Sequence, residues 1–91
     1  MPKLYLPTIM RPNAGGRATV QLAGGTVSEL FGNLVAEYPN VKAQLLDAEG
    51  HVQRHINVYV NGEDVRGLEG EGTSLTERDE IMVLPAMAGG A

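Results

Sequence analysis

The 91-residue chain contains no cysteine and no tryptophan, and its aromatic residues are three tyrosines and one phenylalanine. The absence of cysteine excludes disulfides, thiolate metal sites, a cysteine nucleophile and a persulfide carried on a side chain. Basic residues are also few, since seven lysines and arginines stand against eleven aspartates and glutamates, for a net charge of −4. Because these basic residues are scattered, we expect no nucleic-acid partner and favour a basic or mixed protein surface.

Long apolar runs are missing as well. The longest ones are far shorter than the roughly 20 residues that span a bilayer, and the first residues lack the charged and apolar regions of a signal peptide. We therefore expect a cytoplasmic protein with no membrane partner. The length predicts one small domain with a thin core and no large internal active site.

The first part of the chain predicts two strands joined by a loose turn. Residues 3–10 are rich in strand-forming residues and place Tyr5 on the polar face of a strand that ends near Pro7. Residues 11–16 (RPNAGG) concentrate turn-forming residues. Residues 17–22 then alternate polar and apolar side chains, which indicates a second strand.

A helix is predicted after the glycine pair at 24–25. Thr26, followed three residues later by Glu29, has the pattern of a capping box at a helix start. Pro39 disfavours helical geometry in the residue before it, so the helix is expected to end near Tyr38. One continuous helical stripe carries the apolar side chains. Its members are Val27, Leu30, Phe31, Leu34, Val35 and Tyr38.

Beyond this helix, residues 41–47 favour one or two more helical turns, and residues 48–54 are polar and irregular. Residues 55–60 give the clearest strand, because apolar and polar side chains alternate along it. Asn61-Gly62 is typical of a tight hairpin turn, so a short returning strand is expected to begin at Val65-Arg66.

The glycine-rich, acidic residues 67–80 are expected to form a loop before a last strand at 81–85. The resulting order is strand, strand, helix, strand, short strand, strand. Such an order predicts an α+β fold in which a mixed four- to five-stranded sheet packs on one main helix, the β-grasp arrangement. In this arrangement the first and last strands lie side by side at the centre of the sheet.

The last strand is apolar on both faces, although one helix covers only one face of a sheet. If Ile81 and Val83 point into the core, then Met82 and Leu84 are exposed, next to Met87 on the chain that follows. Exposed methionine and leucine beside a chain end predict a docking patch for a partner protein. The alternative is that these are scattered surface hydrophobic residues, which are common.

Two further residues are weaker candidates for partner contacts. Arg11 lies in the first predicted turn, and Tyr59 lies on the strand face opposite the core. The histidine pair and the glycine-rich acidic segment are not expected to form functional sites. His51 and His55 straddle a loop and a strand start, so a zinc pair is not expected, and residues 67–72 (GLEGEG) lack the lysine of a phosphate-binding loop.

The last three residues of the sequence are Gly89, Gly90 and Ala91. A tail without side chains can enter a narrow channel and bring a carboxylate to a nucleotide phosphate on another enzyme. By itself the glycine pair is a weak signal, because frayed termini tolerate glycine. We accordingly divide the chain into a folded domain at 1–86 and a flexible tail at 87–91.

Three blocks of sequence together resemble a known family. They are LPTIMRP followed by a glycine pair, INVYVNGEDVR, and LTERDEIMVLPAMAGG. These blocks are similar to those of the ubiquitin-like sulfur carriers, relatives of the small proteins of thiamine and molybdopterin synthesis. The resemblance covers essentially the whole chain, and it is strongest to the carriers of thiocarboxylate-dependent cysteine biosynthesis.

The resemblance implies that this chain is a protein co-substrate and not an enzyme. A ubiquitin-activating-type adenylyltransferase would use ATP and magnesium to adenylate the carboxylate of Gly90, and a sulfur source would displace AMP to leave a thiocarboxylate. No cofactor would be bound by this chain. A carrier of this kind needs no thiol of its own, which agrees with the absence of cysteine.

Two more partners are implied by the resemblance, a PLP-dependent cysteine synthase and a JAMM-type zinc metalloprotease. The metalloprotease is expected to remove Ala91, unless Ala91 is a remnant of cloning, because otherwise the terminal carboxylate belongs to the wrong residue. Two alternative functions stay open. One is a ubiquitin-like modifier joined to lysines of target proteins, and the other is a small subunit of a molybdopterin-synthase-type complex.

Overall fold

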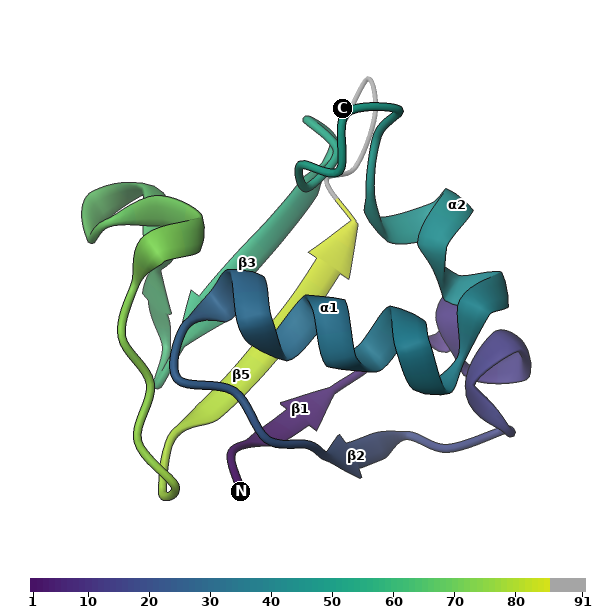
Figure 1. Cartoon of the computed structure of the whole chain (residues 1–91), viewed down its shortest axis with the longest axis horizontal. Helices are drawn as coiled ribbons and strands as arrows, with labels where there is room; N and C mark the ends of the chain where they lie inside the picture. Colours follow the sequence, from purple (N-terminus) through teal and green to yellow (C-terminus); the bar gives the residue numbers. More distant parts are fainter. Residues whose placement is uncertain (86–91) are drawn as a thin grey trace.

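The computed structural model describes residues 1–85 of the chain. Among these residues, five strands form one mixed sheet in the order β2-β1-β5-β3-β4 (Figure 1). The strands are β1 (Lys3–Tyr5), β2 (Thr19–Gln21), β3 (Ile56–Val60), β4 (Glu63–Asp64) and β5 (Glu80–Pro85). β5 pairs in parallel with β1 and antiparallel with β3, so the first and last strands lie side by side as predicted. The α+β, β-grasp prediction is confirmed.

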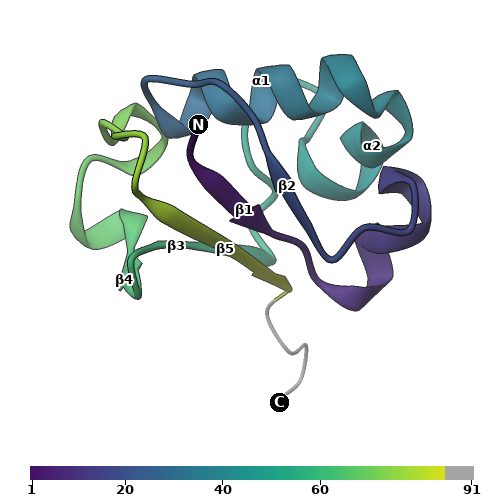
Figure 2. The ribbon, with the colours of Figure 1, turned by 90° about the horizontal axis from the view of Figure 1, so that it is seen from below.

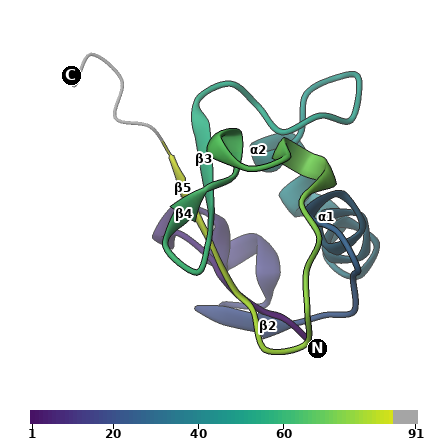
Figure 3. The same cartoon turned by 90° about the vertical axis from the view of Figure 1, so that its left-hand side faces the viewer.

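The long helix α1 (Val27–Glu37) lies across one side of the sheet (Figures 2 and 3). The hydroxyl of Thr26 accepts a hydrogen bond from the backbone N–H of Glu29 at 3.1 Å, which satisfies one of the unpaired donors at the helix start. The carboxylate of Glu29 accepts from the N–H of Gly25 at 2.9 Å, one residue before the expected partner in a capping box. The predicted capping pair is therefore present.

The core lies between α1 and the sheet, as the helical stripe predicted. Its helix side consists of Val27, Leu30, Phe31 and Leu34, all buried. Its sheet side includes the buried residues Leu4, Val20, Ile56, Val58, Val60, Ile81 and Val83. Burying an aliphatic or aromatic side chain of this size contributes about 1.5–3 kcal/mol, so this one interface accounts for most of the hydrophobic stabilisation.

Residues 8–14 differ from the prediction. The structure forms a 3-10 helix, η1 (Thr8–Ala14), where we expected the end of a strand and then an irregular turn. Gly15 ends this helix in the left-handed conformation with a φ of 68°. The side chain of Gln44, far along the sequence, stabilises this helix. Its amide donates a hydrogen bond to the Ile9 carbonyl at 2.9 Å and accepts one from the Asn13 amide at 2.9 Å.

The hairpin after β3 also differs in detail. Asn61 and Gly62 have positive φ values of 51° and 86°, which confirms the predicted tight turn. The returning strand β4 follows at once, and a 3-10 helix, η3 (Val65–Gly67), occupies the place where we expected a strand. The Asp64 carboxylate accepts from the N–H of Arg66 at 2.8 Å and so turns the chain out of the sheet.

Short helical segments cover the remaining edge of the core. They are η2 (Pro39–Val41), α2 (Lys42–Leu45) and η4 (Gly70–Gly72). α2 falls within the predicted helical turns at 41–47, and η4 lies in the acidic loop. Within residues 1–85, every helix is too short to cross a membrane.

Candidate functional site

The candidate site lies on the face of the sheet turned away from α1. Along β5, Ile81 and Val83 are fully buried, whereas Met82 and Leu84 are 41% and 40% exposed. Successive side chains of a strand point to opposite faces, and α1 covers only one of them (Figure 3). The predicted exposure of Met82 and Leu84 is confirmed.

Two tyrosines extend this surface on both sides of β5. The Cα of Met82 is paired with Tyr5 on β1 and with Tyr59 on β3, so the three side chains form a row across the sheet. Both tyrosines are half-buried. We call the surface formed by Tyr5, Met82, Leu84 and Tyr59 the outer face. Tyr59 has its predicted orientation, while Tyr5 was missed as a site residue even though alternation placed it on the polar side.

Two hollows open on the outer face and share Met82 and Leu84. The first has a volume of about 530 Å³ and is lined by both tyrosines of the row. The second has a volume of about 420 Å³ and lies between the end of β5 and η1. Exposed apolar side chains beside hollows of this size are typical of protein-docking surfaces.

Arg11 reaches the second hollow from η1. Its side-chain Nε donates to the carbonyl of Leu6 at 3.2 Å, which fixes the half-buried guanidinium beside the end of β5. Ile9, 56% exposed, and Pro85 line the same hollow. The structure therefore brings Arg11 and Leu84 together, although the role of Arg11 in partner binding stays a prediction.

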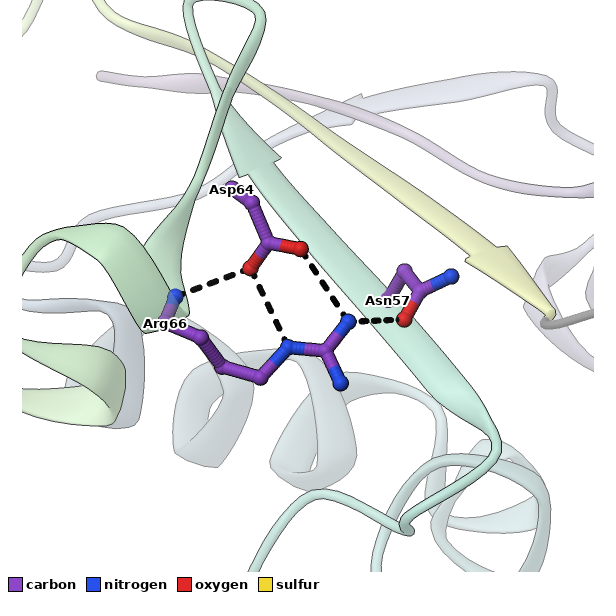
Figure 4. Close-up of polar contacts among 3 residues, drawn as sticks. All are labelled: Asn57, Asp64 and Arg66. Atoms are coloured by element: carbon purple, nitrogen blue, oxygen red, sulfur yellow. Dashed lines mark hydrogen bonds and ion pairs between the residues drawn. The ribbon is translucent and has the colours of Figure 1, made fainter.

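A polar cluster that sequence reasoning missed borders the outer face on the β4 side (Figure 4). The guanidinium of Arg66 donates to both carboxylate oxygens of Asp64, at 3.2 Å from Nε and 3.0 Å from Nη2. Nη2 also donates to the side-chain oxygen of Asn57, whose Cα is paired with Leu84. The i, i+2 spacing of Asp64 and Arg66 in the sequence was the available signal.

The cluster has a defined electrostatic state. The hydrogen bonds from the side chain and then the backbone of Arg66 lower the pKa of the Asp64 carboxyl below its ordinary value. The same side-chain hydrogen bond raises the pKa of Arg66. Both groups stay charged at neutral pH, so the β4 border of the outer face is a fixed ion pair.

The tail predictions lie outside the described residues. Met87, Gly89, Gly90 and Ala91 follow the last described residue, and so does the expected boundary between residues 86 and 87. The structure does describe the strand that precedes these residues. β5 is described up to Pro85, which pairs with Ile56, so the described chain ends at the edge of the outer face.

His51 makes its ionic contact with Glu71 and not with the outer face. His51 Nδ1 is 3.6 Å from a carboxylate oxygen of Glu71, which also accepts from the backbone N–H of Val52 at 3.1 Å. In the part of the chain that the structure describes, no three histidine, aspartate or glutamate side chains gather in a way that could hold a metal ion.

Known proteins are similar to this chain in sequence and in architecture. The sequence profile of the ThiS family matches residues 4–90. Sulfur carrier protein CysO of Mycobacterium tuberculosis is 39% identical over 87 residues, which are 93% of this chain and 94% of that protein. Small archaeal modifier protein 3 of Haloferax volcanii is 38% identical over 65 residues, which are 71% of this chain and 70% of that protein.

Among solved structures, a chain in the Amycolatopsis orientalis BexX/CysO complex has a TM-score of 0.89 and 38% sequence identity to this chain. The match covers 99% of this chain and 100% of that one. Sequence and structure therefore lead to the same group of proteins. Since the family profile spans nearly all of the chain, the chain belongs to the ThiS family.

Proposed function

We propose that this chain is a sulfur carrier that is acted on by an activating enzyme and is not itself an enzyme. The observation that carries the proposal is the exposed apolar outer face, which extends along β5 to Pro85 and so lies next to the start of the tail. The 39% identity to a sulfur carrier and the glycine pair at 89–90 support it.

The proposed chemistry uses the main-chain carboxylate of Gly90. One carboxylate oxygen attacks the α-phosphorus of ATP on the activating enzyme, and pyrophosphate leaves. A nucleophile at the oxidation level of sulfide, hydrosulfide, then attacks the carbonyl carbon of the acyl adenylate, AMP leaves with the electron pair of the broken C–O bond, and the S–H proton is lost. The product is a thiocarboxylate at the chain end. The chain supplies no cofactor to this reaction, and the ATP and magnesium are held by its partner.

Any residue after Gly90, here Ala91, has to be removed before this reaction. We propose a JAMM-type zinc metalloprotease for this step. Cysteine biosynthesis is the proposed destination of the sulfur, with a PLP-dependent cysteine synthase as the partner that accepts it, because the chain is similar to CysO proteins over most of its length.

The outer face is the proposed docking surface for these partners. Met82, Leu84 and Tyr59 would fill an apolar pocket on the partner, and Arg11 would pair with a carboxylate at the border where the tail begins. Met87 would add to the contact from the tail. The similar Amycolatopsis chain comes from a BexX/CysO complex, which supports a docking role for proteins of this shape.

A second function is supported by the 38% identity to a small archaeal modifier protein. In this alternative the Gly90 carboxylate forms isopeptide bonds with lysines of target proteins. The first step, adenylation of Gly90, is common to both functions. They differ in the final acceptor, which is a sulfur atom for the carrier and a lysine amine for the modifier.

Isolation of the chain from its native cells tests both functions at once. The chain is purified without thiol reagents, and the mass of its C-terminal peptide is measured. We expect a peptide ending at Gly90 in which one carboxylate oxygen is replaced by sulfur. A ladder of high-mass conjugates with Gly90 linked to lysine, and no sulfur-bearing peptide, would support the modifier and contradict the carrier.

A further inference from the structure

Two tyrosines and a methionine line the larger hollow of the outer face. Tyr5 and Tyr59 stand on either side of Met82, because both are paired with it across the sheet. Adjacent strands lie about 4.8 Å apart, which puts the two tyrosine Cα atoms roughly 10 Å from each other. The hollow of about 530 Å³ between them has aromatic walls, and Met82 forms its floor.

One end of this hollow is acidic. The exposed Glu80 lines it, and the backbone N–H of Glu80 donates to the Asn61 side-chain oxygen at 3.0 Å. The Asn61 amide in turn donates to the Asp79 carboxylate at 3.0 Å, and this bond lowers the pKa of Asp79, so the carboxylate stays ionised. Glu63 follows the same turn, but it is paired with the buried Val60, so its side chain lies on the opposite face of the sheet.

Arg66 lies near Tyr59 but is already paired with Asp64, which leaves Lys3 beside the carboxylates of Glu80 and Asp79. Lys3 is paired with Glu80 across the sheet, but its ammonium lies over the Tyr5 ring, 5.3 Å from the ring centroid. The contact shows that an aromatic ring of this surface attracts a cation. Lys3 occupies the Tyr5 wall, whereas Tyr59 forms the opposite wall, nearer to Asn61 and Gly62. The remaining excess of negative charge favours a positively charged occupant.

We propose that this hollow receives an arginine side chain of the partner protein that docks on the outer face. The guanidinium stacks on Tyr59 and donates hydrogen bonds to the carboxylate of Glu80, and the aliphatic stem covers Met82. Arginine fits better than lysine, because its planar group stacks on aromatic rings, pairs with a carboxylate through two parallel N–H groups and is more weakly hydrated. This inference rests on the docking role of the outer face in the proposed function.

An NMR titration of the 91-residue chain tests the inference without any partner. The probes are the N-acetyl methylamides of arginine, lysine, norleucine and glutamate. We expect the arginine probe to shift the signals of Tyr5, Tyr59, Glu80 and Met82 at millimolar concentration, with an affinity about fivefold higher than that of norleucine. Equal affinity for arginine and norleucine, tighter binding of lysine or glutamate, or no shift in the hollow would overturn it.

Matched variants assign the binding to the named groups. Glu80→Gln should lower the affinity for the arginine probe about fivefold, and Tyr59→Leu should lower it by a similar factor. Tyr59→Phe keeps the aromatic ring and should retain binding. Glu37→Gln, at the end of α1, removes a carboxylate on the other side of the sheet and should leave the affinity unchanged. If Glu80→Gln and Glu37→Gln bind the probe equally, the assignment is wrong.

The two proposals fail separately. The titration measures only binding in the hollow, whereas the mass of the C-terminal peptide reports only the chemistry of Gly90. A sulfur-bearing Gly90 together with no preference for arginine would leave the carrier function standing and remove this inference. Arginine binding with no sulfur on Gly90 would keep the arginine site and reject sulfur transfer.

Discussion

Gly24 lies against the backbone of the helix that it precedes. A Cβ at this position would be 2.8 Å from both the Cα and the N of Leu30, closer than real Cβ atoms approach backbone. We therefore expect Gly24→Ala to lower the free energy of unfolding by about 1–3 kcal/mol, the usual cost of overpacking. Urea unfolding followed by circular dichroism measures it.

Gly32 is the matched control, because it lies within α1 and an added Cβ there meets no atom within 4 Å. Gly32→Ala should raise the free energy of unfolding by about 0.5–1 kcal/mol, since alanine loses less backbone entropy in a helix. Equal effects of the two substitutions would contradict the close packing of Gly24 on α1.

Asp79 makes the stability of the chain depend on pH. Hydrogen bonds from the Asn61 side chain and the Thr76 backbone lower its pKa below the ordinary 3.8 in the folded state. Such a group stabilises the fold above its unfolded pKa, and this stability is lost as the pH falls through the folded pKa. Asp79→Asn should thus lower the free energy of unfolding at neutral pH, and this loss should become progressively smaller as the pH falls. A cost that stays constant in unfolding measurements from neutral pH to below 3.8 would contradict this linkage.

At the scale of elements, the start of α1 is the clearest local feature. Thr26→Ala removes the side-chain acceptor of the Glu29 N–H and should cost about 1 kcal/mol of stability. Thr26→Ser keeps a hydroxyl at the same place and should retain most of that energy. The comparison by thermal or urea unfolding is decisive, since a cap that contributes nothing would make the two variants equal.

The elements that the sequence predicted correctly are those with local causes. α1 has a helical stripe and a cap within a dozen residues, and β3 and β5 alternate clearly. η1 was missed because its stabilising hydrogen bonds come from Gln44, more than thirty residues away. β4 was placed two residues too late because the Asp64 side chain, and not a hydrophobic pattern, ends the strand.

The same contrast between local patterns and long-range contacts explains which residues of the candidate site could be predicted. Alternation along one strand was enough to expose Met82 and Leu84 and to orient Tyr59. Tyr5 becomes part of the outer face only through the parallel pairing of β1 with β5. The contact between Arg66 and Asn57 depends on the register of β4 against β3, which no single stretch of sequence specifies.

For the whole molecule, the outer face should be required for activation and dispensable for folding. Leu84→Asp should change the free energy of unfolding by less than about 0.5 kcal/mol because the side chain is exposed. It should lower the rate of activation by the adenylating enzyme about tenfold or more, as expected for an apolar residue at the centre of an interface. Pyrophosphate release measures that rate.

Leu68→Asp is the matched control for this substitution. Leu68 is exposed to nearly the same degree, 38% against 40% for Leu84, but it lies in the loop between η3 and η4. Its replacement should leave activation unchanged. If both variants lose activity equally, a general loss of exposed apolar surface explains the effect and the outer face has no special role.

The most direct test of the proposed function concerns the chain end itself. One version of the chain ends at Gly90 and another ends at Ala91, and each is incubated with the activating enzyme, ATP, magnesium and a sulfur donor. We expect the intact mass of the first version to show the exchange of one carboxylate oxygen for sulfur, and the mass of the second to stay unchanged. Equal sulfur incorporation by both versions, or none by the version ending at Gly90, would contradict the proposal that the Gly90 carboxylate carries the sulfur.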